Sequence, residues 1–400
     1  MPLLKPFSKN PIILRLGKDL VRSLKRGHPW VYADALRQLP PALSGSPAIL
    51  LDNKKGREVA RGYYDPHSPL AFRVCTVSAD QPINESWAKA QFEQALALRQ
   101  TLVGEDTTGF RLFNGEGDGL PGLICDVYGQ AAVLQLDGAG PAGFWYLPDV
   151  AGWVAGRLDL ACVYYREQVR QGGGGRALVG ETPGEAVSFF ENGVSFRADI
   201  VQGQKTGFFL DQRENRQRIR GLAKDKRVVN VFGYTGGFSV YAGLGGARQV
   251  TTVDVAEPAL ALAGHNWAIN ALPPANHKVI KADAYQFLEA ARTKKKRWGV
   301  VILDPPSFAP SKEAVPKARK AYQQLIAAGA AVTASAGFLA AASCSSHIEP
   351  ADFLRICEEG VSLARKRATV LGIYGQPADH PSPLPFSEFR YLKFVLMHVT

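Results

Sequence analysis

The second half of the chain alternates apolar runs with segments whose apolar residues recur at helical spacing. From about residue 195 the pairs are RVVNVF and SVYAGLG, QVTTVD and PALALAGHNWAIN, HKVI and AYQFLEAAR, GVVILD and a long helix after residue 313, and GFLAAASC and PADFLRICEEGVSLARK. Regular strand–helix alternation predicts a parallel, doubly wound α/β sheet with helices on both faces. Ligands in such sheets bind beyond the carboxyl ends of the strands. We therefore expect the chemistry of residues 191–400 at those ends.

The first part of the chain has a different pattern, in which short apolar runs alternate with turn residues. The segment AILLDNKKGREVARGYYD predicts a strand, a turn at Asp52 to Gly56 and a second strand, and LAFRVCTV predicts a third. Residues 1–75 are therefore expected to form a small β-rich module.

The middle of the chain mixes the two patterns. Apolar residues at helical spacing predict an amphipathic helix from Glu85 to about Leu102, and a second helix is expected near 143–157. A hairpin is predicted to turn at Tyr128 to Gln130, and Asn192-Gly193 between two alternating runs predicts another. Residues 76–190 are thus expected to form a central α+β domain.

The net charge of +11 is distributed unevenly along these three parts. Residues 1–75 hold thirteen Lys/Arg and five Asp/Glu, residues 76–190 hold seven and fourteen, and residues 191–400 hold twenty-seven and seventeen. Two basic modules thus flank an acidic one. A basic surface attracts polyanions, so nucleic acid is the leading partner class, and solvated surface lysines are the alternative.

Other features exclude several classes of protein. No apolar run approaches the roughly 20 residues of a membrane helix, and the N-terminal stretch is interrupted by Pro2, Pro6 and Pro11. We therefore expect a cytoplasmic protein without a membrane partner. The five cysteines are odd in number and widely spread, which argues against a disulfide framework and against a structural metal.

Three successive strand ends carry residues suited to a nucleoside cofactor. The first strand is followed by Gly233 and Gly236, which let the next helix begin close to a ligand. The second ends at Asp254, eighteen residues after Gly236, where an acid can accept hydrogen bonds from two ribose hydroxyls. The third ends near Asp283, which could hold an adenine amine. Taken singly, each Asp could instead be a helix cap.

The fourth and fifth strand ends carry Asp304 and Cys344. Two prolines after Asp304 hold the preceding backbone extended, so its carboxylate is aimed stiffly at the cleft, where it could bind the Watson–Crick edge of an extruded base. A Pro-Pro turn that merely ends a strand is the alternative. Cys344 could supply a thiolate nucleophile, or it could be an ordinary small apolar residue.

Several motifs together resemble one family. ADIVQGQKTGFFLDQRENR, NVFGYTGGF, LDPPSF, SCSSH and ADHP are similar to the class I S-adenosylmethionine-dependent ribosomal RNA large subunit methyltransferase I family, which makes 5-methylcytosine in large-subunit (23S) rRNA. GHPWVY and ARGYYDPHSPLAFRV resemble its N-terminal PUA (RNA-binding) domain, and GEGDGLPGLICDVYG its central domain. The resemblance implies a Rossmann-like methyltransferase domain at the C-terminus, preceded by these two domains.

The resemblance also implies roles for individual residues. Those expected to contact S-adenosylmethionine are Asp211, Gln212, Arg213, Phe232, Gly233, Tyr234, Gly236, Asp254, Asp283 and Asp304. Cys344 would add to C6 of cytosine, and Asp304 would stabilise charge at N3. Many RNA cytosine-5 methyltransferases carry a second cysteine after the two prolines, where this chain has Ser307. Ser346 also stands where the family is expected to have Gly.

Two other functions remain open at this point. The first is N-methylation of guanine or adenine in rRNA, which needs no thiol. The second is an RNA-binding ribosome assembly factor that no longer catalyses. Whether the protein forms a homodimer is also open.

Overall fold

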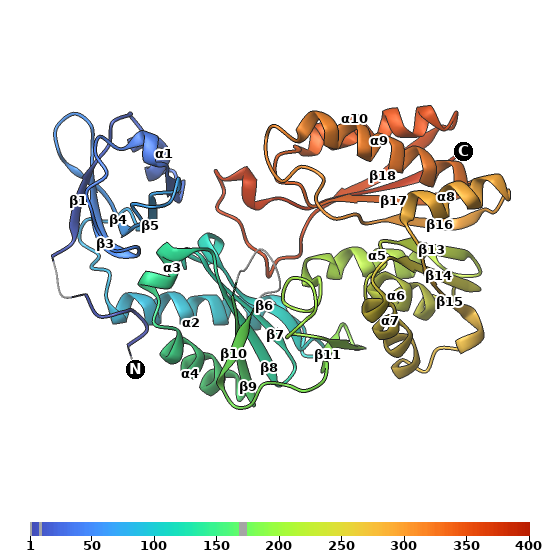
Figure 1. Cartoon of the computed structure of the whole chain (residues 1–400), viewed down its shortest axis with the longest axis horizontal. Helices are drawn as coiled ribbons and strands as arrows, with labels where there is room; N and C mark the ends of the chain where they lie inside the picture. Colours follow the sequence, from blue (N-terminus) through green and yellow to red (C-terminus); the bar gives the residue numbers. More distant parts are fainter. Residues whose placement is uncertain (1, 8–9, 168–173) are drawn as a thin grey trace. The chain divides into compact units, whose positions relative to one another are not determined.

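The computed structural model describes residues 2–7, 10–167 and 174–400, and Figure 1 shows its helices and strands. The chain packs into two compact units. Unit 1 comprises Met1–Asn192, Ala198–Phe208 and Ala378–Phe389, and unit 2 comprises Gly193–Arg197, Phe209–Pro377 and Arg390–Thr400. These units reflect packing and do not test the boundaries predicted near residues 75 and 190, which stay predictions.

The first sheet of unit 1 has the order β1-β3-β4-β5-β2. Its strands are β1 (Ile12–Arg15), β2 (Trp30–Val31), β3 (Ser46–Leu51), β4 (Glu58–Tyr64) and β5 (Phe72–Thr76), and a short helix α1 (Val21–Lys25) follows β1. The strands β3 and β4 pair antiparallel. Between them, Asp52 Oδ1 accepts hydrogen bonds from the backbone N–H groups of Lys54, Lys55 and Gly56 at 2.6 to 2.9 Å. The predicted strand–turn–strand unit is therefore present.

The second sheet of unit 1 has the order β10-β9-β8-β7-β6. It is built from β6 (Gly109–Asn114), β7 (Leu123–Tyr128), β8 (Ala131–Leu136), β9 (Cys162–Arg166) and β10 (Gly175–Val179), with helices α2 (Glu85–Leu102), α3 (Ala139–Phe144) and α4 (Leu147–Leu158). The helix α2 has the predicted bounds, and the side chain of Asn84 caps it by accepting from Trp87 N. The hairpin β7–β8 also forms as predicted.

The second predicted hairpin turn has the expected backbone. Asn192 and Gly193 both have positive φ angles, of 48° and 71°. The strands β11 (Val187–Glu191) and β12 (Val194–Ala198) lie on either side of them in the chain. A left-handed pair of residues is what a two-residue turn of this type requires, and Asn-Gly adopts it readily.

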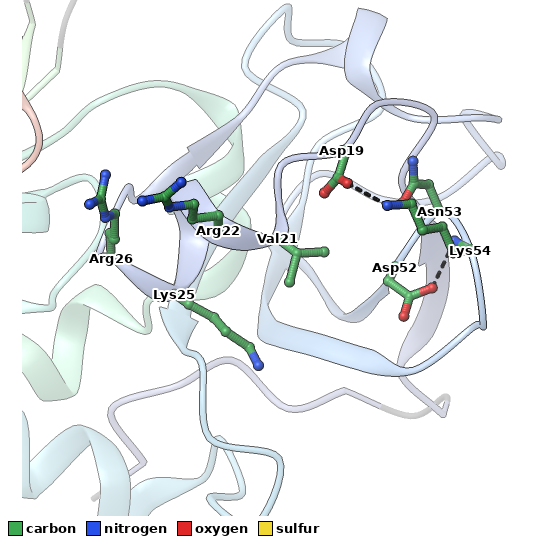
Figure 2. Close-up of a pocket in the computed structure, with 8 residues that line it drawn as sticks. All are labelled: Asp19, Val21, Arg22, Lys25, Arg26, Asp52, Asn53 and Lys54. Carbon is green, nitrogen blue, oxygen red and sulfur yellow. Dashed lines mark hydrogen bonds and ion pairs between the residues drawn. The ribbon is translucent and has the colours of Figure 1, made fainter.

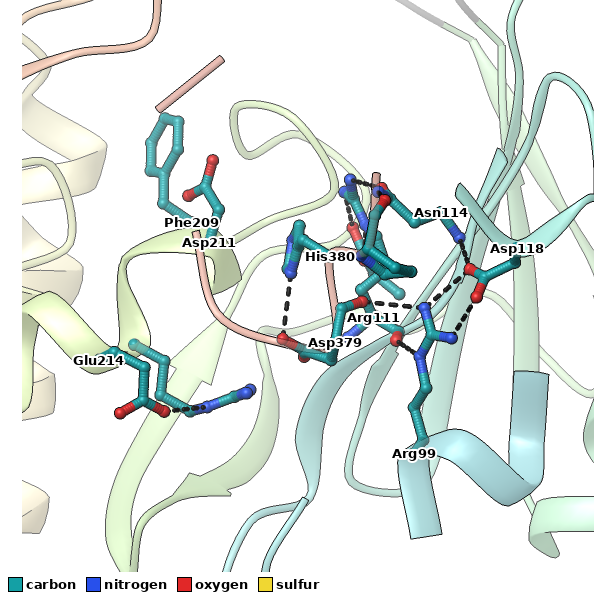
Figure 3. Close-up of polar contacts among 12 residues, drawn as sticks. Arg99, Arg111, Asn114, Asp118, Phe209, Asp211, Glu214, Asp379 and His380 are labelled. Carbon is teal, nitrogen blue, oxygen red and sulfur yellow. Dashed lines mark hydrogen bonds and ion pairs between the residues drawn. The ribbon is translucent and has the colours of Figure 1, made fainter. Parts of the chain in front are cut away.

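A buried polar network ties a late segment of the chain into unit 1 (Figure 3). Arg99 forms a bidentate ion pair with Asp118 and donates to the carbonyl oxygen of Asp379 at 2.9 Å. The Asp379 carboxylate accepts from the backbone N–H of Arg111 at 3.1 Å, and Asn114 donates to the carbonyl of Pro381 at 2.8 Å. The ADHP motif therefore sits on the second sheet of unit 1, although 280 residues separate Asp379 from Arg99 along the chain.

The sheet of unit 2 has seven strands in the order β15-β14-β13-β16-β17-β19-β18. They are β13 (Arg227–Val231), β14 (Gln249–Asp254), β15 (His277–Lys281), β16 (Trp298–Leu303), β17 (Thr333–Ser343), β18 (Ala368–Tyr374) and β19 (Lys393–Val399). The strands β13 to β17 are parallel, as the alternation predicted. In contrast, β19 runs antiparallel to both β17 and β18. Periodicity carries no information on strand order, so this insertion was not predicted.

Helices cover both faces of this sheet, because side chains along a strand alternate between faces. The helices are α5 (Arg213–Leu222), α6 (Gly237–Leu244), α7 (Glu257–Ile269), α8 (Ala284–Thr293), α9 (Val315–Val332) and α10 (Pro350–Leu363). Val301 and Leu303 of β16 pack into a core with α8, α9 and α10, whereas Val300 and Ile302 pack into a second core with α5, α6 and α7. Within the described residues, no helix is both long enough and apolar enough to cross a membrane.

The strand order of unit 2 reverses beside β13, because β14 lies on one side of it and β16 on the other. Such a switch point is where ligands bind in open α/β sheets. Val231 is in register with Val253 on β14 and with Leu303 on β16, and Leu303 is in register with Ala341 on β17. The segments that follow these residues therefore emerge at one edge of the sheet.

The first prediction concerns the ion pair in unit 1. Asp118→Ala should lower the free energy of unfolding of this unit by about 3–5 kcal/mol, because it leaves the Arg99 charge buried and without its carboxylate. Urea denaturation followed by circular dichroism measures the change. Glu93→Ala is the matched control: its ion pair with Arg157 is half exposed and should contribute less than about 1 kcal/mol. Equal losses in the two variants would contradict the prediction.

Candidate active site

The turn after β13 has an unusual backbone. Phe232 and Tyr234 have positive φ angles of 61° and 45°, and Gly236 caps α6 with a φ of 80°. Left-handed backbone in non-glycine residues costs on the order of 1–3 kcal/mol and gathers at ligand sites. A Cβ on Gly233 would lie 2.5 Å from Thr252 Cγ2, and one on Gly236 would lie 2.9 Å from Ala263 Cβ. The turn thus depends on both glycines to pack against β14 and α7.

Asp254 holds this turn in place. Its Oδ2 accepts from the backbone N–H of Tyr234 at 2.9 Å, and its Oδ1 accepts from that of Ala256 at 2.9 Å. Each carboxylate oxygen has two lone pairs, so both can accept a further hydrogen bond from a hydroxyl. Asp254 therefore links the glycine-rich turn to the position predicted for a ribose.

Asp283 is a helix cap, which is the alternative role for this residue. It is the N-cap of α8, and its Oδ1 accepts from the backbone N–H of Gln286 at 3.0 Å. The side chain is exposed, and the cap does not use its second oxygen. A cap and an adenine contact are compatible at this residue, and the contact stays a prediction.

Asp304 follows β16, and its backbone N–H lies 3.4 Å from the carbonyl oxygen of Val231. Burial raises the pKa of its carboxyl to about 7, and the negative charge of Asp211 adds to the shift. A hydrogen bond with Gln212 and the charge of Arg216 lower the pKa in part. Asp211 and Gln212 belong to the 3-10 helix η3 (Leu210–Gln212), so the structure brings them to Asp304 from far along the chain.

Asp211 has an incompletely satisfied carboxylate. Its Oδ2 accepts from the hydroxyl of Tyr391 at 2.8 Å, whereas its Oδ1 is buried and has no hydrogen-bond partner within the described part of the chain. Two neighbouring acids, one with a raised pKa and one with an orphaned oxygen, form a site that a cationic group would stabilise. S-adenosylmethionine carries an ammonium and a sulfonium, so the residues present fit it. Arg213, the first residue of α5, is buried, and its Nε lies 3.5 Å from Oε1 of Glu214. Its contact with the cofactor stays a prediction.

The turns that carry Asp304 and Cys344 are bonded to each other. Ser345 Oγ lies 3.0 Å from Ser307 Oγ and 3.1 Å from the Tyr322 hydroxyl, and it accepts from the backbone N–H of Ala309 at 3.3 Å. Ser343 donates to the same Tyr322 hydroxyl at 3.1 Å. Ser307, the position where a second cysteine was considered, thus joins the DPPSF turn to the SCSSH turn.

The register of β16 and β17 gives the spacing between the two reactive groups. Asp304 follows Leu303 directly, and Cys344 comes three residues after Ala341, the register partner of Leu303. If both strands continued in extended geometry past their ends at Leu303 and Ser343, about 4.8 Å apart and with a rise of about 3.3 Å per residue, the two Cα atoms would be roughly 8 Å apart. Side chains at that separation can contact opposite edges of one pyrimidine ring.

Lys393 is a member of this site that the sequence analysis missed. It opens β19, is buried, and donates to the carbonyl oxygens of Ser345 at 2.5 Å and Tyr391 at 2.7 Å. Burial lowers the pKa of its amine to about 8, and the charges of Cys344 and Glu349 oppose the shift. In the sequence it is one lysine before an apolar run, a pattern typical of an exposed strand end.

Unit 1 has a separate candidate surface beside α1. A hollow of about 530 Å³ is lined there by Asp19, Val21, Arg22, Lys25, Arg26, Asp52, Asn53 and Lys54 (Figure 2). Arg22, Lys25 and Arg26 are exposed, whereas Lys54 pairs with Asp19 at 2.9 Å. Trp30 is half-buried against Phe386, and its Nε1 donates to Glu116 at 2.6 Å. Trp30 is therefore a packing residue, and the α1 cations form the accessible basic surface.

Comparison with known proteins gives matches along nearly the whole chain. Residues 150–373 match the S-adenosylmethionine-dependent methyltransferase family, and residues 14–76 match the PUA-like domain. The chain is 38% identical to the ribosomal RNA large subunit methyltransferase of Deinococcus radiodurans, over 98% of this chain and 99% of the relative. It is 37% identical to the ribosomal RNA large subunit methyltransferase I of Photobacterium profundum, over 94% and 97%.

Two solved structures with a similar fold are also described as methyltransferases. The fold is similar to the crystal structure of SMU.776, described as a methyltransferase complexed with SAH, with a TM-score of 0.85 and 25% identity over 97% of this chain and 100% of that one. It is also similar to a SAM-dependent methyltransferase from Streptococcus mutans, with a TM-score of 0.84, 25% identity and the same coverage. The S-adenosylmethionine cofactor implied by the family resemblance is therefore confirmed, and it belongs to the nucleoside class predicted from the strand ends.

The second prediction tests the cofactor pocket. Asp254→Ala should weaken binding of S-adenosylhomocysteine by at least about tenfold, because it removes a charged acceptor and releases the turn at Tyr234. Isothermal titration calorimetry of the ligand-free protein measures the affinity. Glu257→Ala, an exposed position at the start of α7, is the control and should bind like the parent. Unchanged affinity in Asp254→Ala would rule out this assignment.

The third prediction follows from the buried acid. Asp304→Asn should raise the melting temperature of the ligand-free protein, and by more at pH 8 than at pH 5. Because the folded-state pKa of about 7 exceeds the unfolded value, the carboxyl loses its stabilising contribution as the pH rises from about 4 to 7. Asn has no charge to bury. Differential scanning calorimetry at both pH values measures the gain, with the exposed cap variant Asp283→Asn as control, and equal gains at the two pH values would refute the prediction.

Proposed function

The chain belongs to the ribosomal RNA large subunit methyltransferase I family, whose members are S-adenosylmethionine-dependent, and from this we propose that it forms 5-methylcytosine in large-subunit (23S) rRNA through a covalent Cys344 adduct. The observation that carries the proposal is the hydrogen bond between Ser307 and Ser345. It joins the turns that follow Asp304 and Cys344. Together with the register of β16 and β17, it supports a thiol and a carboxyl beside one base.

C5 of cytosine is too weakly nucleophilic to take a methyl group by itself. The reaction therefore requires a group on the enzyme that first adds to the ring. The Cys344 thiolate adds to C6, and the electrons of the C5–C6 double bond then make C5 reactive. S-adenosylmethionine supplies an electrophilic methyl group when it is bound. A base or water then takes the C5 proton, the electrons of that C–H bond restore the C5–C6 double bond, and the C6–S bond breaks with its electrons returning to sulfur. The thiolate is thus regenerated.

Asp304 has a distinct part in this proposal. A carboxyl with a pKa of about 7 is substantially protonated at neutral pH, so it can donate a hydrogen bond to N3 of the base. That bond stabilises the negative charge that develops on the ring when the thiolate adds.

The RNA partner is supported by unit 1. The residues that match a PUA-like domain include α1, whose exposed Arg22, Lys25 and Arg26 line one side of the hollow in Figure 2. Exposed cations of this kind bind phosphate groups in a salt-dependent manner. Large-subunit rRNA as the substrate implies action in the cytoplasm. A homodimer stays a prediction that a measurement of mass in solution would test.

The fourth prediction tests the nucleophile. Purified protein with labelled S-adenosylmethionine and rRNA from cells that lack the gene should give 5-methylcytosine, and Cys344→Ala should reduce it below about 0.1% of the parent. Nucleoside mass spectrometry identifies the product. Cys75→Ala is the control, because Cys75 is also half-buried but lies on β5.

The outcomes of this experiment separate the alternatives. Full activity of Cys344→Ala would overturn the covalent mechanism. A methylated guanine or adenine would indicate N-methylation instead. Cofactor binding without any methyl transfer to RNA would indicate an assembly factor.

A further inference from the structure

Lys393 is a buried cation next to the residue proposed as nucleophile. On β19 it is the register partner of Ser343, the residue before Cys344. The residue is 2% exposed, and its Nζ donates to the carbonyl oxygen of Ser345 in the Cys344 turn. A second hydrogen bond, to the carbonyl of Tyr391, also holds the amine. The position of the charge is therefore set by two bonds.

Among the residues that the structure describes, Lys393 forms no ion pair. Both of its hydrogen-bond acceptors are neutral carbonyls, although an ammonium group has three N–H donors. The ionisable groups whose charges act on this amine are Cys344 and Glu349, and Tyr322 is a further ionisable group that interacts with Cys344. Glu349 is the residue that precedes α10, at its N-cap. An isolated buried cation is costly, so a thiolate at Cys344 would be a stabilising partner.

We propose that Lys393 is the positioning residue that converts Cys344 to a thiolate and keeps it charged until it attacks the base. The proposal rests on the function proposed above and adds the group that activates its nucleophile. The neutral amine accepts the proton of Cys344: the S–H bond breaks, an N–H bond forms, and a thiolate–ammonium pair results. No further reactant is needed. When the C6–S bond breaks at the end of the reaction, the same ammonium stabilises the departing thiolate.

The acid strengths of the two groups are suited to this transfer. The Lys393 amine has a pKa of about 8, and an ordinary cysteine thiol has a pKa of about 8.5. A proton moves between groups of similar pKa at little cost. Burial raises the pKa of the other four thiols, Cys75, Cys125, Cys162 and Cys357, so we expect none of them to be activated.

The fifth prediction tests this activation without RNA or methyl transfer. The rate of alkylation of Cys344 by iodoacetamide is measured from pH 5 to 10 by peptide mass spectrometry. The parent should show a midpoint at least one pH unit below the ordinary value of about 8.5. Lys393→Gln keeps amide donors for the two carbonyls but removes the charge, so its midpoint should rise by at least one unit and its rate at pH 6 should fall about tenfold. Lys393→Arg keeps the charge and should retain most of the shift.

The controls separate activation from a loss of structure. S-adenosylhomocysteine binding and the melting temperature should be close to the parent in both variants, and alkylation of Cys75 should be unchanged. A Cys344 midpoint at or above about 8.5 in the parent would overturn the proposal even if neither variant folds. An unchanged midpoint in a folded Lys393→Gln would also overturn it. Failure of the methyl transfer assay would instead count against the proposed function, because alkylation does not depend on RNA.

Discussion

The parallel pairing of β16 between β13 and β17 is the constraint on which the site depends. Parallel strands end at the same edge of a sheet, so three turns from distant parts of the sequence emerge together there. The first turn carries the left-handed Phe232 and Tyr234, the second carries Asp304, and the third carries Cys344. A change of register on either side of β16 would separate them. The hydrogen bond between Ser307 and Ser345 then holds the last two turns at a fixed spacing.

Buried charged groups have different kinds of partner in the two compact units. In unit 1 the buried Arg99 meets a buried carboxylate in a bidentate pair, and two further N–H groups donate to backbone carbonyls. Such a group is satisfied without any ligand. In unit 2, as far as the structure describes the chain, one carboxylate oxygen of Asp211 has no hydrogen-bond partner and Lys393 has only neutral acceptors. Burial also raises the pKa of Asp304 to about 7. Buried charges without full compensation destabilise the fold, and a bound substrate or cofactor can supply the missing partner.

The end of the chain completes the site. After the segment Ala378–Phe389 packs in unit 1, the chain continues in unit 2 with Tyr391 and Lys393. The hydroxyl of Tyr391 binds Asp211 at the cofactor side, and its carbonyl binds Lys393 beside the Cys344 turn. The antiparallel strand β19 is what delivers both residues, because it enters next to β17 at the edge where the parallel strands end. A short stretch of backbone thus connects the two halves of the site.

The sequence by itself determined the local elements and the residues at their ends. The bounds of α2, the turn at Asp52 and the alternation from β13 to α10 follow from spacing, since burial on one face of a helix or strand dictates which positions are apolar. Asp254, Asp304 and Cys344 could be selected because each directly ends a predicted strand. Only the tertiary structure decided strand order, the antiparallel direction of β19, and the meeting of Asp211 with Asp304 and of Lys393 with the Cys344 turn. These features depend on contacts between residues far apart in the chain, which local patterns do not encode. A lysine before an apolar strand has the same local pattern whether its amine is exposed to water or buried in a site.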